Sequence, residues 1–121
     1  MDDFQDYNSF PFGTCTWYAD NRFHELYGYF VPWHNNAMAW QWATRAAEYG
    51  WDVSATPSVG SIIILQSGVQ GAGSAGHVGI VERVLDDGSV IASSMNWWPN
   101  PAAVSYQRYQ TGQGVSFAKP S

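Results

Sequence analysis

Hydrophobic and polar positions change their spacing about halfway along this chain. Thr14 is a typical N-cap and predicts a first helix over 14–27. Apolar residues then recur at helical spacing and predict a second helix from 35 or 36 to 49, ending before Gly50. After Pro57 the pattern changes to short apolar runs typical of strands, at 62–65, 77–85, 89–96, 103–109 and 115–118. Because the helices precede the strands, the order predicts an α+β domain with its N-terminal helices packed on a C-terminal antiparallel sheet.

The length of the chain favours one domain. With 121 residues, it can bury one real core, so we expect a single domain over 1–121 with an irregular segment at 1–11. The 77–85 and 89–96 strands form a predicted hairpin that turns through Asp86-Asp87-Gly88. The Gly-, Ser- and Ala-rich stretch at 68–76 is predicted to be a loop that borders a site.

Composition and charge exclude several classes of function. The longest aliphatic run is Ile62–Leu65, so no segment is predicted to insert into a membrane, and the N-terminus lacks the pattern of a signal peptide. The net charge of -5, without a Lys or Arg cluster, argues against a nucleic-acid partner. One cysteine and three dispersed histidines give neither a disulfide framework nor a zinc motif. Seven Trp and seven Tyr exceed what one small core comfortably buries, which indicates an aromatic binding groove.

Cys15 is the candidate nucleophile. It follows Gly13 at the start of the first predicted helix, where backbone N–H groups and the helix dipole lower the pKa of a thiol and can bind an oxyanion. Gly13 would let a substrate carbonyl approach the backbone closely. The competing interpretation is an inert, buried cysteine.

His77 is the candidate base, since it opens an apolar strand directly after Gly76. His24 lies on the first predicted helix and His34 precedes the second, and both fit half-exposed polar positions. A hydrogen-bonded structural histidine is the alternative for His77. A four-residue hairpin loop would pair His77 with Asn96, whose amide oxygen could then accept the imidazole N–H and fix its tautomer. Asn96 could instead be a turn residue at the end of the strand.

Five segments in order resemble the CHAP domain, the family of cysteine, histidine-dependent amidohydrolases and peptidases, and they cover nearly the whole chain. The resemblance implies a papain-like α+β fold and hydrolysis of an amide bond in peptidoglycan, either between the glycan and its stem peptide or within the peptide. It also implies Cys15 as nucleophile and His77 as base, with no cofactor. The segments are Phe12-Gly13-Thr14-Cys15-Thr16-Trp17-Tyr18, Asn36-Ala37 with Trp40, Pro57-Ser58-Val59-Gly60-Ser61-Ile62, Gly76-His77-Val78-Gly79-Ile80-Val81-Glu82, and Ser93-Ser94-Met95-Asn96-Trp97.

The chain departs from the family pattern at two positions. Thr14 stands where the family usually has Gln, which matters little because the expected oxyanion contact is the backbone N–H of Cys15. Ser94 stands where many members carry a Glu that orients the histidine, and Asn96 is retained two residues later. We therefore predict a Cys15, His77, Asn96 set, with Ser94 as the competing third position and reduced activity as a possible consequence. Some members hold calcium before the cysteine, but Phe10 and Phe12 interrupt the ligand pattern after Asp6 and Asn8, so no metal is predicted.

Three aromatic residues are candidates for binding the substrate, since Trp33, Trp97 and Trp98 lie next to the site motifs. Bacterial peptidoglycan is the predicted partner, and the predicted location is secreted, wall-associated or released with a phage lysin. Two other functions remain open: a catalytically weak or silent wall-binding module, and an amidase of a small amide outside the wall.

Overall fold

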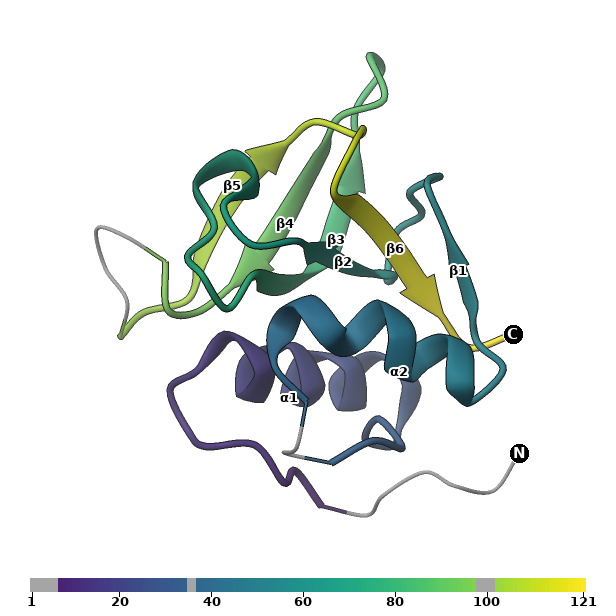
Figure 1. The fold of residues 1–121 in the computed structure, drawn as a ribbon, viewed down its shortest axis with the longest axis vertical. Helices are drawn as coiled ribbons and strands as arrows, with labels where there is room; N and C mark the ends of the chain where they lie inside the picture. Colours follow the sequence, from purple (N-terminus) through teal and green to yellow (C-terminus); the bar gives the residue numbers. More distant parts are fainter. Residues whose placement is uncertain (1–6, 35–36, 98–101) are drawn as a thin grey trace.

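Two helices lie against one face of a six-stranded antiparallel sheet (Figure 1). The structure is a computed structural model that describes residues 7–34, 37–97 and 102–121. Along the sheet the strand order is β1-β6-β2-β3-β4-β5. In these residues, neither helix is long and apolar enough to cross a membrane. The elements are α1 (Cys15–Tyr27), the 3-10 turn η1 (Ala39–Gln41), α2 (Trp42–Glu48), β1 (Asp52–Ser54), β2 (Ile62–Leu65), the 3-10 turn η2 (Val69–Gly71), β3 (His77–Val84), β4 (Val90–Ser94), β5 (Ser105–Tyr109) and β6 (Val115–Lys119).

This architecture confirms the predicted α+β class, but the second helix is shorter than predicted. α2 begins at Trp42, after η1, while residues 35 and 36 lie outside the described residues. Met38 is extended, and its N–H donates to the Gln41 side chain at 2.8 Å, which fixes the start of η1. The apolar spacing predicted too long a helix because Ala37 is buried outside any helix and Ala39 begins only the short 3-10 turn η1. β1 was not predicted, since its three residues carry no pattern of their own and it forms by pairing with β6.

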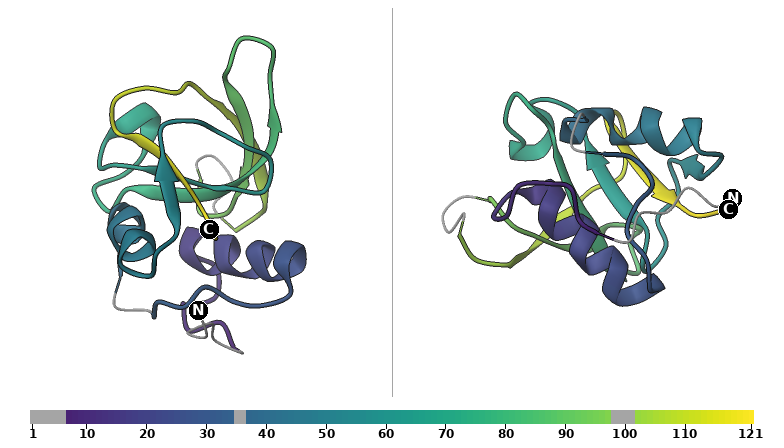
Figure 2. Two further views of the ribbon diagram at one scale, coloured as in Figure 1. Left: turned by 90° about the vertical axis from the view of Figure 1, so that its right-hand side faces the viewer. Right: turned by 90° about the horizontal axis from the view of Figure 1, so that it is seen from below.

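The sheet is buried on both faces around β2. Ile62 and Ile64 pack into the core beneath the helices, whereas Ile63 and Leu65 face a second core on the other side of the sheet. Residues from β2, β3, β4, β5 and β6 all contribute to that second core, so the sheet is curled around it, as Figure 2 illustrates. The alternation explains why a run of four aliphatic residues forms a central strand.

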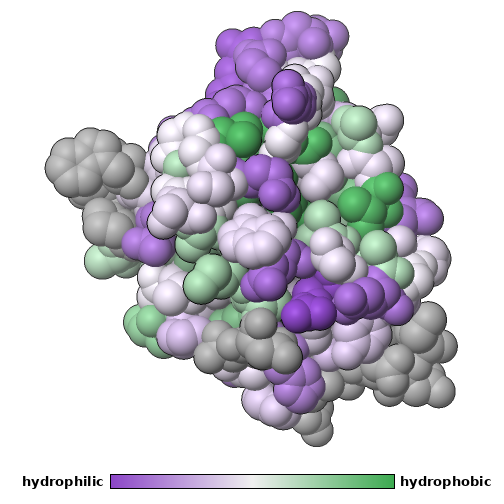
Figure 3. Space-filling view, viewed as in Figure 1, coloured by the Kyte–Doolittle hydropathy of each residue, from purple (hydrophilic) through white to green (hydrophobic). Residues whose placement is uncertain are grey.

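A bulge sets the register of the β3–β4 hairpin. Near the turn, Val84 pairs with Val90, but beyond the irregularity between Val81 and Arg83, Ile80 pairs with Ser93. The bulge shifts the ladder by one residue, so the register at the inner end of the hairpin is the one predicted for a four-residue loop. In Figure 3 the hydrophilic side chains gather at the outer tip of this hairpin, away from the helices.

An ion pair ties α1 to the sheet. The Arg22 guanidinium donates to both oxygens of Glu82 at 3.0 Å, and the Ser93 hydroxyl donates to Glu82 at 2.6 Å. Arg22 holds the pKa of Glu82 below its ordinary value, so the carboxylate stays charged. This bidentate contact orients α1, and therefore its N-terminal residue Cys15, relative to β3.

Candidate active site

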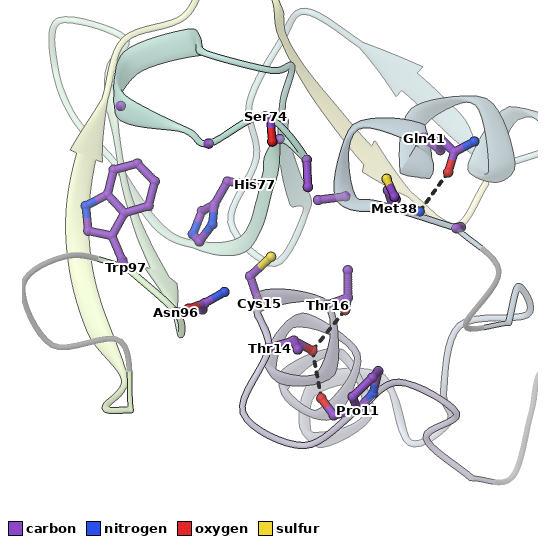
Figure 4. A pocket seen from close by; sticks show the side chains of 16 residues that line it. Pro11, Thr14, Cys15, Thr16, Met38, Gln41, Ser74, His77, Asn96 and Trp97 are labelled. Atoms are coloured by element: carbon purple, nitrogen blue, oxygen red, sulfur yellow. Dashed lines mark hydrogen bonds between the residues drawn. The ribbon is translucent and has the colours of Figure 1, made fainter.

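One pocket of about 990 Å³ lies where the start of α1 meets the inner end of β3 (Figure 4). It brings together Cys15, His77, Asn96 and Trp97, which are four of the predicted site residues. The remaining described residues that line it are Pro11, Thr14, Thr16, Ala37, Met38, Ala39, Gln41, Gly71, Gly73, Ser74, Ala75 and Gly76.

Cys15 is the first residue of α1, as predicted. Gly13, at φ +91, makes the turn into the helix, and the Thr14 side chain caps it by accepting the Trp17 N–H at 3.1 Å. The prediction that the helix start lowers the thiol pKa is wrong in this structure. Burial raises the pKa of Cys15, and backbone hydrogen bonds at Val78, Thr16 and Cys15 itself only partly oppose it. The resting sulfur is therefore a neutral thiol that needs a base.

His77 is the first residue of β3 and lies between Trp97 and Cys15 in Figure 4. Its position depends on Gly76, at φ +75, where an added Cβ would lie 2.5 Å from the Leu65 carbonyl oxygen and 2.9 Å from the Trp40 Cβ. The imidazole is 4% exposed, and burial lowers its pKa to about 4. At neutral pH it is uncharged and has a nitrogen lone pair able to accept a proton.

The predicted hydrogen bond between Asn96 and His77 is not formed in this structure. His77 Nε2 is buried and has no hydrogen-bond partner among the described residues. β4 ends at Ser94, and Asn96 follows in the left-handed region at φ 62, exposed at the edge of the pocket. The strand therefore ends before it can carry the Asn96 amide over the imidazole.

Ser94, the competing third position, is fully buried and is not among the residues that line the pocket. It lies next to the Tyr109 hydroxyl, which the sequence did not single out. Burial raises the pKa of Tyr109, so this phenol is protonated at neutral pH. The alternation of inward and outward residues along β5 was the only signal that could have directed Tyr109 toward the site.

The aromatic candidates separate in the fold. Trp97 lines the pocket and packs on His77 with ring centroids 4.5 Å apart. The prediction that Trp33 binds the substrate is wrong. Trp33 is 2% exposed in the core, where it packs against Trp42 and Trp51, because the chain that follows α1 runs beneath the helices. Trp98 lies outside the described residues.

The other two histidines do not line the pocket. His24 stacks on Phe30 with ring centroids 4.1 Å apart, and His34 is exposed at the surface. His77 is thus the histidine that the described part of the fold brings to Cys15.

The pocket is lined by small and uncharged groups. The loop at 71–76 supplies much of the lining, as its composition predicted, while Met38 and Gln41, from the neighbouring segment that donates the Trp40 N–H to Ala75, were not predicted. Its described lining contains no Asp, Glu, Lys or Arg. Across the described ranges, no three His, Cys, Asp or Glu side chains are grouped closely enough to hold a metal ion.

The fold and the pocket together define an α+β domain in which a thiol and an imidazole line the same pocket at the junction of helices and sheet. The chain belongs to the CHAP domain family, whose model matches residues 5–96. It is 37% identical over 105 residues to an N-acetylmuramoyl-L-alanine amidase, sle1, of Staphylococcus epidermidis, covering 86% of this chain and 30% of that protein. It is 36% identical over 115 residues to a probable autolysin, SsaALP, of Staphylococcus aureus, covering 95% of this chain and 41% of that protein. The chain therefore spans less than half the length of these relatives.

Solved structures have the same fold. The crystal structure of an N-acetylmuramoyl-L-alanine amidase from Staphylococcus aureus matches with a TM-score of 0.83 and 27% identity, over 100% of this chain and 34% of that one. The crystal structure of Ly7917 with the hydrolyzing product of MDP matches with a TM-score of 0.61 and 20% identity, over 98% of this chain and 58% of that one. At the latter identity the likeness extends to the fold alone.

Proposed function

We propose that this domain hydrolyses an amide bond of peptidoglycan, with Cys15 as nucleophile and His77 as general base. The observation that carries the proposal is that a thiol at a helix start and a neutral imidazole at a strand start line the same pocket, although they are far apart in sequence. Family membership and the similarity to N-acetylmuramoyl-L-alanine amidases support the reaction class.

The mechanism begins with a proton transfer, because the buried thiol is neutral. His77 takes the thiol proton as the sulfur attacks the amide carbonyl carbon, and the backbone N–H of Cys15 at the helix start donates to the developing oxyanion. His77 then returns the proton to the leaving nitrogen as the C–N bond breaks. Water activated by the same imidazole hydrolyses the thioester and releases the acid.

Since Nε2 of His77 faces the protein interior, Nδ1 is the nitrogen we assign to this proton exchange. Asn96 stays in the proposed site, but as an exposed amide that contacts the substrate from the pocket edge. Asn96→Ala should accordingly raise KM more than it lowers kcat; the reverse pattern would return Asn96 to the role of orienting His77.

The uncharged lining suits an amide bond between neutral groups. Both the N-acetylmuramoyl–L-alanine bond and a bond between small neutral residues of the peptide meet this condition. Trp97 provides an aromatic wall for either a sugar or a peptide. We propose a secreted or wall-associated location, where such a bond is accessible.

The decisive experiment measures release of soluble fragments from purified peptidoglycan, with mass spectrometry of the products to identify the bond. Cys15→Ala and His77→Ala should each abolish release, whereas His24→Ala, a histidine outside the pocket, should retain it. Binding to insoluble peptidoglycan is measured in parallel. If the wild-type protein binds but releases nothing, the domain is a wall-binding module; if Cys15→Ala remains active, the assignment of the nucleophile is wrong.

A further inference from the structure

Buried polar groups without partners gather behind the candidate base. Within the described residues, four such atoms are His77 Nε2, Ser94 Oγ, Ser105 Oγ and Tyr109 Oη. They come from the neighbouring strands β3, β4 and β5. His77, Ser94 and Tyr109 are 4%, 0% and 2% exposed, so bulk solvent does not reach them.

The strand register places these four side chains on one face of the sheet. Ser94 pairs directly with Ser105, and Tyr109 follows Ser105 at an even spacing on the same strand. On the other side, continuing the ladder inward from the Ile80–Ser93 pair sets Gly79 opposite Ser94, and His77 lies two residues before Gly79. The four polar groups thus share the face that carries the second core.

Two ring contacts tie this group together. The Trp97 ring packs on His77 at 4.5 Å between centroids and on Tyr109 edge-on at 5.6 Å. Trp97 therefore covers the space between the imidazole and the phenol. The Ser94 hydroxyl is close enough to Tyr109 to lower the pKa of the phenol in part, and a negative charge on Cys15, when the thiol ionises, would raise it.

The residues on the sheet beside the imidazole are small. A Cβ at Gly79 would lie 2.6 Å from the Ser93 carbonyl oxygen and 3.3 Å from the Ser94 Cβ, so only glycine fits opposite Ser94 and no side chain stands between Ser94 and His77 on β3. Gly79 and Ser94 face each other on a surface otherwise filled by Leu65, Val81 and Ala92. A buried water needs two to four polar partners, and buried polar groups without a partner destabilise the fold.

We propose that His77, Ser94, Ser105 and Tyr109 enclose an internal water that positions the catalytic imidazole. The water accepts the Nε2–H of His77 and donates to the Tyr109 and Ser94 oxygens, and the Ser105 hydroxyl completes the network. It holds the neutral ring with its proton on Nε2 and its lone pair on Nδ1, toward Cys15. Ser94, Ser105 and Tyr109 are then positioning residues, in the place where many CHAP domains carry a Glu. The expected effect of these residues on kcat rests on the proposed function, whereas the water-mediated hydrogen bonds to His77 do not depend on it.

The first test reads the imidazole directly, by nitrogen-15 NMR of the His77 ring in the intact domain. The ionisable groups that face the ring from other elements are the Cys15 thiol on α1 and the Tyr109 phenol on β5. The wild-type protein should have the proton predominantly on Nε2. Tyr109→Phe and Ser94→Ala should each shift the tautomer ratio by about tenfold, the equivalent of one hydrogen bond. Tyr106→Phe, on the exposed face of the same strand, is the matched control and should leave the ratio unchanged.

The second test locates the water and its effect on turnover. A high-resolution crystal structure should contain one ordered water within about 3 Å of Nε2 and of the Tyr109 or Ser94 oxygen. Tyr109→Phe should lower kcat about tenfold without changing KM, and its effect should not add to that of Ser94→Ala. Asn96 hydrogen-bonded directly to Nε2, or a tautomer ratio unaffected by both variants, would overturn the proposal. If Tyr109→Phe fails to fold, the tautomer ratios of Ser94→Ala and Ser105→Ala test the proposal instead. Because the NMR measurement needs no activity, it tests the water network even if the domain does not cleave peptidoglycan.

Discussion

Replacing Asp20 by Asn should change how the stability of this domain depends on pH. Asp20 lies on α1 with 1% of its surface exposed, and its Oδ1 accepts the Val31 N–H at 2.7 Å. This bond fastens the chain that leaves α1 back onto the helix. No positive side chain is among the causes of its pKa shift: burial raises the pKa of Asp20 from 3.8 to about 7, and the Val31 hydrogen bond only partly opposes it.

The magnitude follows from this shift. Between pH 3.8 and about 7 the folded protein holds a proton on Asp20 that the unfolded chain has lost, so the free energy of unfolding falls as the pH rises. At 1.36 kcal/mol per unit, ionising Asp20 inside the fold costs about 4 kcal/mol at pH 8. An asparagine oxygen can still accept the Val31 N–H and never ionises, so the variant escapes this cost. Its extra buried N–H₂ group adds a penalty that is the same at every pH.

The assay is chemical unfolding of both proteins from pH 4 to pH 8. Relative to the wild type, Asp20→Asn should gain about 4 kcal/mol between these limits, whatever the constant penalty. His77, whose pKa is lowered to about 4, has the opposite effect: protonating it in the unfolded chain costs stability as the pH falls below 6.5. That contribution is common to both proteins and cancels in the difference. A difference that does not vary with pH would refute the buried, protonated Asp20.

Three further predictions concern the site. Because burial lowers the His77 pKa to about 4, kcat/KM on peptidoglycan should fall on the acid side near pH 4; an acid limb near pH 6.5 in the pH–rate profile would contradict the environment described for His77. Ser94→Glu should raise the pKa of His77, since a carboxylate stabilises the imidazolium, so the acid limb of the pH–rate profile should move to higher pH. An acid limb at the same pH as in the wild type would mean that the side chain at position 94 does not face the imidazole. Gly76→Ala should lower the melting temperature, because its Cβ would meet the Leu65 carbonyl oxygen at 2.5 Å, whereas Gly73→Ala, with nothing within 4 Å, should leave the melting temperature unchanged; thermal unfolding of both variants checks this.

Local signals in the sequence determined much of the scaffold. Thr14 and the left-handed Gly28 bound α1, because capping depends on a few neighbouring residues. The aliphatic run at 62–65 formed the central strand β2, and the 77–85 and 89–96 segments formed the β3–β4 hairpin. Cys15 and His77 could be chosen because a helix start and a strand start next to glycines leave clear local patterns.

Tertiary structure decided what those patterns could not. The apolar residues before α2 follow a helical spacing, but Ala37 is buried outside any helix and Ala39 begins only the 3-10 turn η1. Trp33 is buried by packing against Trp42 on α2 and Trp51 just before β1 rather than by any local preference. The state of Cys15 was likewise decided by its surroundings, since burial outweighs the local effect of the helix start on its pKa. Tyr109 reaches the region of His77 only because β5 pairs with β4 and Trp97 folds over both. Caps, strands and turns depend on neighbours in sequence, whereas burial, ionisation and the partners of a side chain depend on neighbours in space, which only the folded chain brings together.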